Sequence, residues 1–255
     1  MNTTRRGDDE FQLLAKALAG SPQAATAVHL LGRGLCTAHV AGELSSPTAA
    51  VVVPDFRPER VLAFGHDLDA LWHLLCTLRH WKTVNTSPGA SSVVSARMEE
   101  RFESSVRRHE CAYFVLTVPP PALVHPLVRR LTPDDEPLIE EAPPFLQQGR
   151  LFGGPRALLR EGIIAGAVDQ GKLVATAHTA TMTADYADIG VATLDAYRRQ
   201  GIAAAAASLV CQAVQAMNRV PVWDCATDNV ASVHLAEKLG FRPIDGRVDL
   251  TRGDG

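Results

Sequence analysis

The sequence predicts an α/β (α+β) fold arranged in two lobes. Short apolar runs of strand length alternate with amphipathic segments of helix length, which is typical of sheets covered by helices. Three consecutive prolines, Pro119 to Pro121, interrupt this alternation. We therefore expect an N-terminal α/β lobe over residues 1–125 and a second domain over residues 126–255. At 255 residues and 46% hydrophobic composition, the chain can bury one large core or two small ones.

The N-terminal lobe shows a mixed order of helices and strands. Hydrophobic spacing predicts a helix over 10–19, strands over 49–53 and 61–64, a helix over 67–81, a charged amphipathic segment over 95–108 and a strand over 111–118. This order indicates a lobe with a sheet of its own.

The second domain has a clearer pattern. Its expected elements are a strand over 127–131, a helix opened by Thr132 and Pro133, a hairpin of strands 162–168 and 173–179, a strand over 188–193, a helix over 203–217, a strand over 220–225, a helix over 229–239 and a strand after Phe241. Gly171 lies in the polar loop of the hairpin, where a tight turn favours glycine.

Charge and composition exclude several classes of protein. The 25 Lys and Arg residues against 28 Asp and Glu residues leave a net charge of −3, so no basic surface for nucleic acid is expected. The apolar runs are far shorter than the roughly 20 residues that cross a bilayer, and the amino terminus has no apolar signal core. The five cysteines form no Cys-x-x-Cys pair, so we expect no metal site. These observations favour a cytoplasmic protein.

The segment from Arg198 to Ala203 lies between a predicted strand and a predicted helix. Free backbone N–H groups and the positive end of the helix dipole make such a position suitable for a diphosphate. Glycine at 201 would let a phosphate approach the backbone, and two arginines add cationic donors. By itself the pattern is weak, because an arginine and a glycine at a helix start usually form a solvated cap.

A second motif begins at Asn229 and ends at Phe241, with Ser232, Leu235, Ala236 and Gly240 between them. Asn229 is a suitable helix cap, and Leu235 and Leu239 are expected to face the core.

Together the two motifs resemble the GCN5-related N-acetyltransferase (GNAT) superfamily. The resemblance rests on Val191-x-Thr193-x-x-x-Tyr197-Arg198-x-x-Gly201-Ile202-Ala203 and on the segment from Asn229 to Phe241, and it extends over roughly residues 127–247. It implies a GNAT-like mixed central sheet flanked by helices. Trp223-Asp224-Cys225 further resembles a two-lobed bacterial subgroup that includes antibiotic self-resistance acetyltransferases, in which the N-terminal lobe would be a degenerate GNAT-like half.

The resemblance implies an acetyl-CoA site, with acetyl-CoA as co-substrate. Backbone groups of Val191 and Thr193 would pair with the pantetheine arm, amides of the loop would hold the pyrophosphate, and Asn229 and Ser232 would face the cofactor. The cofactor-binding residues expected on this basis are Val191, Ala192, Thr193, Arg198, Arg199, Gln200, Gly201, Ile202, Ala203, Asn229 and Ser232.

The implied reaction is direct attack of an amine on the thioester. Ala236 stands where many family members carry a tyrosine that protonates the departing thiolate, so Ser232 or water would serve instead. Because a thiol of pKa near 8.5 leaves at pH 7.5 at a cost of about 1.4 kcal/mol, this loss is tolerable. Candidate bases are Asp188, His178 and Asp224, or a chain of water molecules.

The sequence therefore predicts an acetyl-CoA-dependent N-acetyltransferase that acts on a primary amine of a small molecule, with self-resistance or natural-product modification as its setting. Two alternatives stay open: a non-catalytic acyl-CoA-binding module, which the alanine at 236 favours, and a protein or peptide N-acetyltransferase. The sequence does not predict an oligomeric state.

Overall fold

The computed structural model describes residues 8–253, and their contacts form two compact units. The first unit contains residues up to Ala112 and those from Asp245 onward, and the second runs from Tyr113 to Ile244. This division differs from the expected boundary between 125 and 126 at both ends. Strands β5 (Val106–Val115) and β11 (Arg242–Arg252) each continue from one unit into the other, so each unit includes part of both strands.

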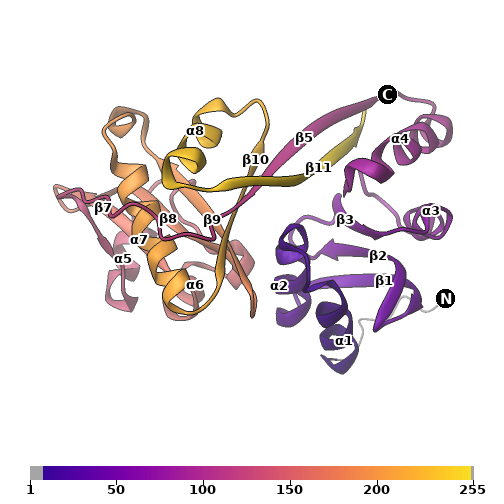
Figure 1. Cartoon of the computed structure of the whole chain (residues 1–255), viewed down its shortest axis with the longest axis horizontal. Coiled ribbons are helices and arrows are strands. Elements are labelled where there is room, and N and C mark those ends of the chain that lie inside the picture. The colour runs from indigo at the N-terminus through magenta and orange to yellow at the C-terminus, as the bar shows by residue number, and fades with distance from the viewer. Residues whose placement is uncertain (1–7, 254–255) are drawn as a thin grey trace. The chain divides into compact units, whose positions relative to one another are not determined.

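The first unit is a sheet with strand order β1-β2-β3-β4-β11-β5. Its elements are α1 (Asp8–Leu18), α2 (Ala25–Arg33), β1 (Cys36–Glu43), β2 (Ser46–Pro54), β3 (Arg60–Gly65), α3 (Leu68–Thr77), β4 (Thr83–Thr86) and α4 (Pro88–Phe102) (Figure 1). The parts of β5 and β11 that belong to this unit complete it. Strands β1, β2 and β3 form an antiparallel meander, and α3 connects β3 to the parallel strand β4.

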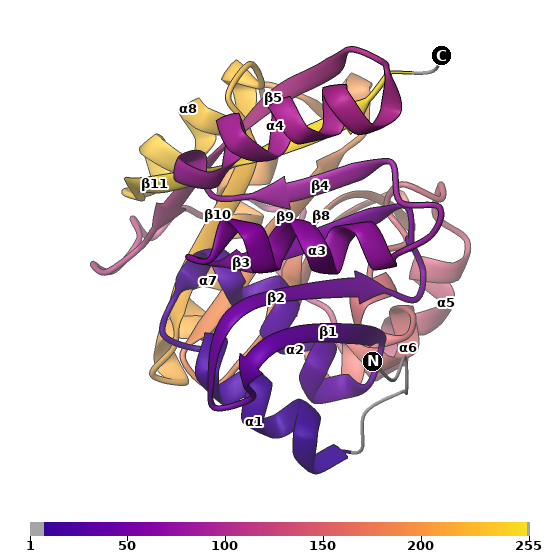
Figure 2. The same cartoon turned by 90° about the vertical axis from the view of Figure 1, so that its right-hand side faces the viewer.

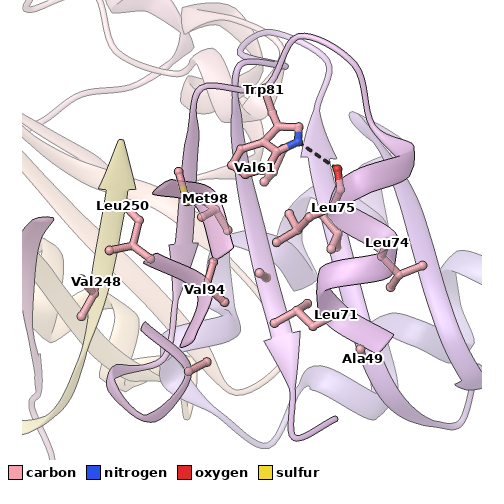
Figure 3. Packing of buried hydrophobic residues seen from close by; sticks show 14 residues of the cluster. Ala49, Val61, Leu71, Leu74, Leu75, Trp81, Val94, Met98, Val248 and Leu250 are labelled. Carbon is pink, nitrogen blue, oxygen red and sulfur yellow. Dashed lines mark hydrogen bonds between the residues drawn. The ribbon is translucent and has the colours of Figure 1, made fainter. Parts of the chain in front are cut away.

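Helices α3 and α4 lie on one face of these strands (Figure 2) and bury the main core of the unit. Within it, the indole N–H of Trp81 donates to the Leu75 carbonyl at 2.9 Å (Figure 3). Strand β11 adds Val248 and Leu250 to the same core and pairs antiparallel with β4. This burial explains why the last residues of the chain belong to the first unit rather than to the second.

The second unit is a sheet with strand order β5-β10-β9-β8-β7-β6. Its elements are β6 (Val128–Arg130), α5 (Glu136–Glu140), α6 (Pro155–Glu161), β7 (Ile164–Asp169), β8 (Lys172–Met182), β9 (Tyr186–Thr193), α7 (Ile202–Ala216), β10 (Val220–Ala226) and α8 (Val230–Leu239). Helix α7 contacts β6 to β10, and its buried alanines allow a close approach to the sheet. None of the described helices is both long and apolar enough to cross a membrane.

The structure confirms the mixed α/β class and most expected elements, and it adds four that the sequence patterns did not indicate. These are α2, β1, β4 and α6. The helix expected over 67–81 ends at Thr77, because Leu78 has an extended backbone (φ −82°, ψ 145°) and Trp81 turns back onto the helix. The segment expected over 95–108 begins earlier as α4, because Ser87 caps the helix and Pro88 occupies its first turn.

The parallel strands β3 and β4 of the first unit separate after Leu62 and Asn85, and the side chain of Arg247 occupies the opening. Its guanidinium donates to the carbonyls of Ala63 (2.6 Å) and Asn85 (2.9 Å) and to Asn85 Oδ1, and it lies 4.4 Å from the ring centroid of Phe64. Arg247 is only 5% exposed. A buried charge with this many acceptors holds β11 against both strands.

Replacing Arg247 with methionine should lower the free energy of unfolding by about 3 kcal/mol, since the buried carbonyls of Ala63 and Asn85 lose their donor. Urea denaturation monitored by tryptophan fluorescence measures the change. Arg107→Met is the matched control, because Arg107 is exposed on β5 of the same unit. An equal loss in both variants would contradict a specific role for Arg247.

Candidate functional site

Strands β9 and β10 of the second unit run parallel but pair only at Tyr186–Val220, Ala187–Pro221 and Asp188–Val222. Strand β9 continues to pair with β8 on its other side as far as Thr193. From Ile189 onward, β9 therefore has one edge that no neighbouring strand covers.

The backbone groups on this open edge belong to alternate residues. The Leu194 N–H donates to the Val174 carbonyl at 2.9 Å, so the Leu194 backbone faces β8. Since backbone groups of an antiparallel strand face alternate sides, those of Ala192 also face β8, whereas those of Val191 and Thr193 face the opening. Val191 and Thr193 thus present the free edge expected from the sequence, and Ala192 contributes only to the lining.

The loop after β9 turns its backbone through two left-handed positions, Arg199 (φ 61°) and Gly201 (φ 83°). Among the described residues, no backbone carbonyl accepts from the amides of Arg199, Gln200 or Gly201, and no side chain caps α7. A β-carbon added at Gly201 would meet no protein atom within 4 Å. The loop therefore directs free N–H groups and a helix N-terminus toward open space.

A groove of about 810 Å³ lies between β9, this loop and helix α8. Ten of the eleven residues expected to bind the cofactor line it, namely Val191, Ala192, Thr193, Arg198, Arg199, Gly201, Ile202, Ala203, Asn229 and Ser232. Gln200 does not, because its side chain turns back to donate to the Ala196 carbonyl at 2.9 Å.

The groove also contains residues that sequence reasoning missed. Phe145 lies far from the motifs in sequence, and His234 and Lys238 continue the α8 face that begins at Asn229. Leu235, expected to face the core, lines the groove, whereas Leu239 is buried as expected. Asn229, Ser232, Leu235 and Lys238 follow one another at intervals of three residues and form one stripe along α8, so the periodicity of the helix was the available signal, although not for His234.

Helix α8 holds Ser232 in a defined position. Asn229 Oδ1 accepts from the Ser232 N–H at 3.2 Å, and the Ser232 hydroxyl oxygen accepts from the indole N–H of Trp223 at 3.0 Å. Trp223 is buried and packs edge-to-face against Phe241, with ring centroids 5.5 Å apart. The hydroxyl proton of Ser232 is thus directed away from Trp223.

A smaller pocket of about 360 Å³ adjoins the groove, because Val191, Asn229 and Ser232 line both. The three candidate bases, His178 on β8, Asp188 on β9 and Asp224 on β10, all line this smaller pocket. Ala236, which replaces the expected tyrosine, is fully buried and lines neither space. The tertiary structure therefore brings together carboxylates that lie 36 positions apart in sequence.

The buried groups of the smaller pocket have perturbed proton affinities. Burial raises the pKa of Asp188 well above its usual range, and the neighbouring Asp224 carboxylate, through its charge and a hydrogen bond, raises it further. Burial lowers the pKa of His178 to about 4, so its imidazole is neutral near pH 7. Asp188 Oδ1 and His178 Nδ1 are both buried and have no hydrogen-bond partner among the described residues.

Two smaller residues complete this pocket. A β-carbon at Gly190 would lie 2.6 Å from His178 Cε1, so only glycine allows the imidazole to rest against β9. Burial raises the pKa of the Cys225 thiol, although Ser232 hydrogen-bonds to it. The cysteine therefore stays protonated at neutral pH and is a poor nucleophile.

The groove fits acetyl-CoA by the chemistry of its donors. The free strand edge suits an extended amide-containing arm, and the exposed amides and the helix N-terminus suit a diphosphate. Arg199 adds positive charge beside them, whereas Arg198 pairs with the Asp195 carboxylate at 2.9 Å. No atom of the residues that the structure describes lies within 4 Å of the position that a β-carbon at Gly201 would take.

Comparison with known proteins agrees with this geometry. Residues 142–245 match the family model described as GNAT acetyltransferase. No curated protein matches the sequence.

Several solved structures share the fold over nearly the whole chain. A Drosophila protein is 14% identical with a TM-score of 0.71 and 97% coverage of both chains. A GNAT-family acetyltransferase from Colwellia psychrerythraea is 14% identical with a TM-score of 0.63, covering 97% of this chain and 98% of its own. A tandem GNAT protein from the clavulanic acid biosynthesis pathway is 18% identical with a TM-score of 0.60, covering 99% of this chain and 98% of its own.

These likenesses establish the fold, and the family model covers both motifs, from the strand that contains Val191 to the glycine and phenylalanine after α8. Residues 142–245 form a GNAT acetyltransferase domain, which makes the chain an acyltransferase.

Proposed function

We propose that the chain transfers the acetyl group of acetyl-CoA to a primary amine of a small molecule. The observation that carries this proposal is that the groove and the smaller pocket meet. Val191, Asn229 and Ser232 line both the groove proposed for the cofactor and the pocket that Asp188 lines. An acceptor in the smaller pocket meets the end of the groove at these residues. A volume of about 360 Å³ is at the small end for ligand sites, which favours a metabolite over a peptide.

Acetyl-CoA supplies a thioester whose carbonyl carbon an amine can attack directly. In our proposal the amides after Arg198 and the helix N-terminus hold its pyrophosphate, and the free edge of Val191 and Thr193 aligns its arm. Asn229, whose side-chain oxygen already accepts from the Ser232 N–H, has an amide N–H₂ left to donate.

Asp188 is the base in this proposal. An alkyl ammonium must lose a proton before it attacks, and a carboxylate with a raised pKa accepts protons better than an ordinary aspartate. The neutral His178, with a pKa of about 4, is a weaker choice. The C–N bond forms as the C–S bond breaks; the ammonium gives one proton to Asp188, which releases it to solvent, and a second proton from nitrogen ends on the sulfur.

Ser232 is positioned to deliver that second proton. Its oxygen accepts from Trp223 and its O–H hydrogen-bonds to Cys225, so the hydroxyl must rotate from the Cys225 sulfur toward the groove to deliver the proton. Trp223 thus acts as a positioning residue through Ser232.

The first unit repeats the order of elements of the second unit, as a degenerate GNAT-like half would. Like β7 to α8, it has an antiparallel meander, a helix, a parallel strand and a further helix. In the first unit, the positions that correspond to the strand opening and to the uncapped helix start are filled by the protein's own side chains. Arg247 occupies the opening between β3 and β4, and Asp67 caps α3 by accepting from Asp69 N and Ala70 N. We infer one acyl-CoA site per chain, in the second unit.

We also place the protein in the cytoplasm, in a role of self-resistance or natural-product modification. No disulfide joins any two of the five cysteines, all of which the structure describes, as expected in a reducing compartment. The tandem GNAT protein of the clavulanic acid pathway, which shares the fold over 99% of this chain, supports the proposed role in natural-product modification.

The direct test of the proposed function is release of free thiol from acetyl-CoA with separate panels of small amines and peptides, with the products identified by mass spectrometry. Turnover with small amines supports the proposal. Turnover with peptides alone would favour a protein acetyltransferase, and tight cofactor binding without any product would favour a non-catalytic acyl-CoA-binding module.

Replacing Gly201 with valine should weaken acetyl-CoA binding at least about tenfold, because a β-branched residue disfavours φ 83° by roughly 1–3 kcal/mol and the loop relaxes away from the groove. Isothermal titration calorimetry measures the affinity. Gly171→Val is the matched control: Gly171 has φ 75° and an equally open β-carbon position, but lies in the hairpin between β7 and β8. Equal affinities for both variants would contradict the loop assignment.

Replacing Asp188 with asparagine should lower kcat/KM by about 10²–10⁴-fold, the usual contribution of a general base. The neighbouring position Asp185, exposed before β9, provides the control Asp185→Asn, which should retain activity. In the Asp224→Asn variant the acid limb of the kcat/KM–pH profile should move to lower pH, because removing the Asp224 charge lowers the pKa of Asp188. An unshifted limb would argue against Asp188.

Replacing Ser232 with alanine should lower kcat by no more than about tenfold to a hundredfold while acetyl-CoA affinity holds, since unassisted departure of the thiolate costs about 1.4 kcal/mol. Steady-state kinetics with calorimetry measures both quantities. Ser232→Thr keeps the hydroxyl and should recover most of the rate. Complete loss of turnover with unchanged affinity would instead make Ser232 an essential acid.

A further inference from the structure

The smaller pocket of the second unit is acidic. Two carboxylates, Asp188 and Asp224, line it, and its described lining contains no lysine or arginine. The imidazole in its wall, His178, is neutral and so does not balance these charges. A ligand in this pocket therefore faces two acidic side chains and none of the lysines or arginines of the described chain.

Two buried polar atoms of this pocket lack a partner. Asp188 Oδ1 and His178 Nδ1 have no hydrogen-bond partner among the described residues, and His178 is only 5% exposed. Buried polar groups are nearly always paired, so an unpaired acceptor indicates that a ligand or water supplies the donor. A primary ammonium group carries three N–H donors and a positive charge, which matches both the unpaired atoms and the sign of the pocket.

We infer that the acceptor is a small organic cation with no carboxylate beside its amino group, and that Asp188 and Asp224 receive its ammonium together. This inference rests on the proposed function and adds a selection rule to it. An α-amino acid would bring a carboxylate, one carbon from its nitrogen, toward the Asp224 carboxylate, whose charge already raises the pKa of its hydrogen-bonded neighbour Asp188. Like charges at such a distance repel, so the same pocket that attracts an amine rejects the corresponding amino acid.

The test compares amines with the amino acids that differ from them by one carboxylate. The pairs are phenethylamine and phenylalanine, tyramine and tyrosine, and 3-methylbutylamine and leucine. Binding is measured by calorimetry on the full chain saturated with CoA, which reports selection without requiring turnover. We expect the amine of at least one pair to bind at least tenfold more tightly than its amino acid. Phenylalanine methyl ester, which has the bulk without the charge, should bind more like the amine.

The double variant Asp188→Asn, Asp224→Asn tests whether the carboxylates cause the selection, because in Asp224→Asn alone the pKa of Asp188 falls and Asp188 keeps a negative charge. We expect the ratio of amine to amino-acid affinity to fall to within about threefold in this variant, with acetyl-CoA affinity unchanged as the check of folding. Equal binding within the wild-type pairs, an ester that binds as poorly as the amino acid, no binding of any amine, or an unchanged ratio in the variant would each overturn the inference.

Thiol release from acetyl-CoA, measured with the same compounds, separates this inference from the proposed function. Selective binding without thiol release would refute amine acetylation but leave the charge selection intact. Equal thiol release from amines and amino acids would support acetylation and refute the selection.

Discussion

Strands β9 and β10 pair at only three positions and then separate, and each part of the site depends on that separation. Past Asp188, the backbone groups of Val191 and Thr193 no longer face a strand, and the space beside them becomes the groove. Asp224 and Cys225 follow Val222, the last residue of β10 that pairs with β9, and both line the smaller pocket. An open edge in a sheet leaves polar groups unpaired, and a ligand with amides can pair them.

The first unit shows what happens when the same opening is filled from within. Strands β3 and β4 also separate, but the guanidinium of Arg247 donates to carbonyls on both sides. In the second unit the helix after the diverging strand starts without a side-chain cap and beside two arginines, whereas α3 starts with the carboxylate of Asp67 on its amides. An anion is therefore favoured at one helix N-terminus and repelled at the other. In the proposed function, this contrast makes the second unit the binding unit and the first a structural one.

The chemistry of the smaller pocket follows from burial more than from residue type. Aspartate is ordinarily ionised at neutral pH, but the surroundings of Asp188 and the nearby Asp224 raise its pKa, while burial keeps His178 neutral. The residue best suited to accept a proton is thus a carboxylate and not the histidine. Gly190 supports this arrangement, because any larger residue would displace the imidazole from the wall.

The sequence by itself determined the features that depend on neighbouring residues. The free amides at the helix start after Gly201 and the cap formed by Asn229 follow from local backbone chemistry, and ten of the eleven residues that the family resemblance implied line one groove. The family resemblance also implied that the backbone groups of Val191 and Thr193 are the ones open to a ligand, and the strand pairing of β9 agrees with this. Leu235 was misplaced, because a helical face that borders a groove is apolar in the same way as one that borders a core.

Only the tertiary structure decided what depends on residues far apart in the chain. It brought Asp188 and Asp224 to one pocket and set their proton affinities through burial, which no spacing in the sequence reports. It also placed the end of β11 in the first unit, against the boundary expected from the prolines, because Val248 and Leu250 complete the core beneath α3 and α4. Strand pairing and burial are long-range interactions, so a local pattern indicates that a strand exists but not which strand it joins.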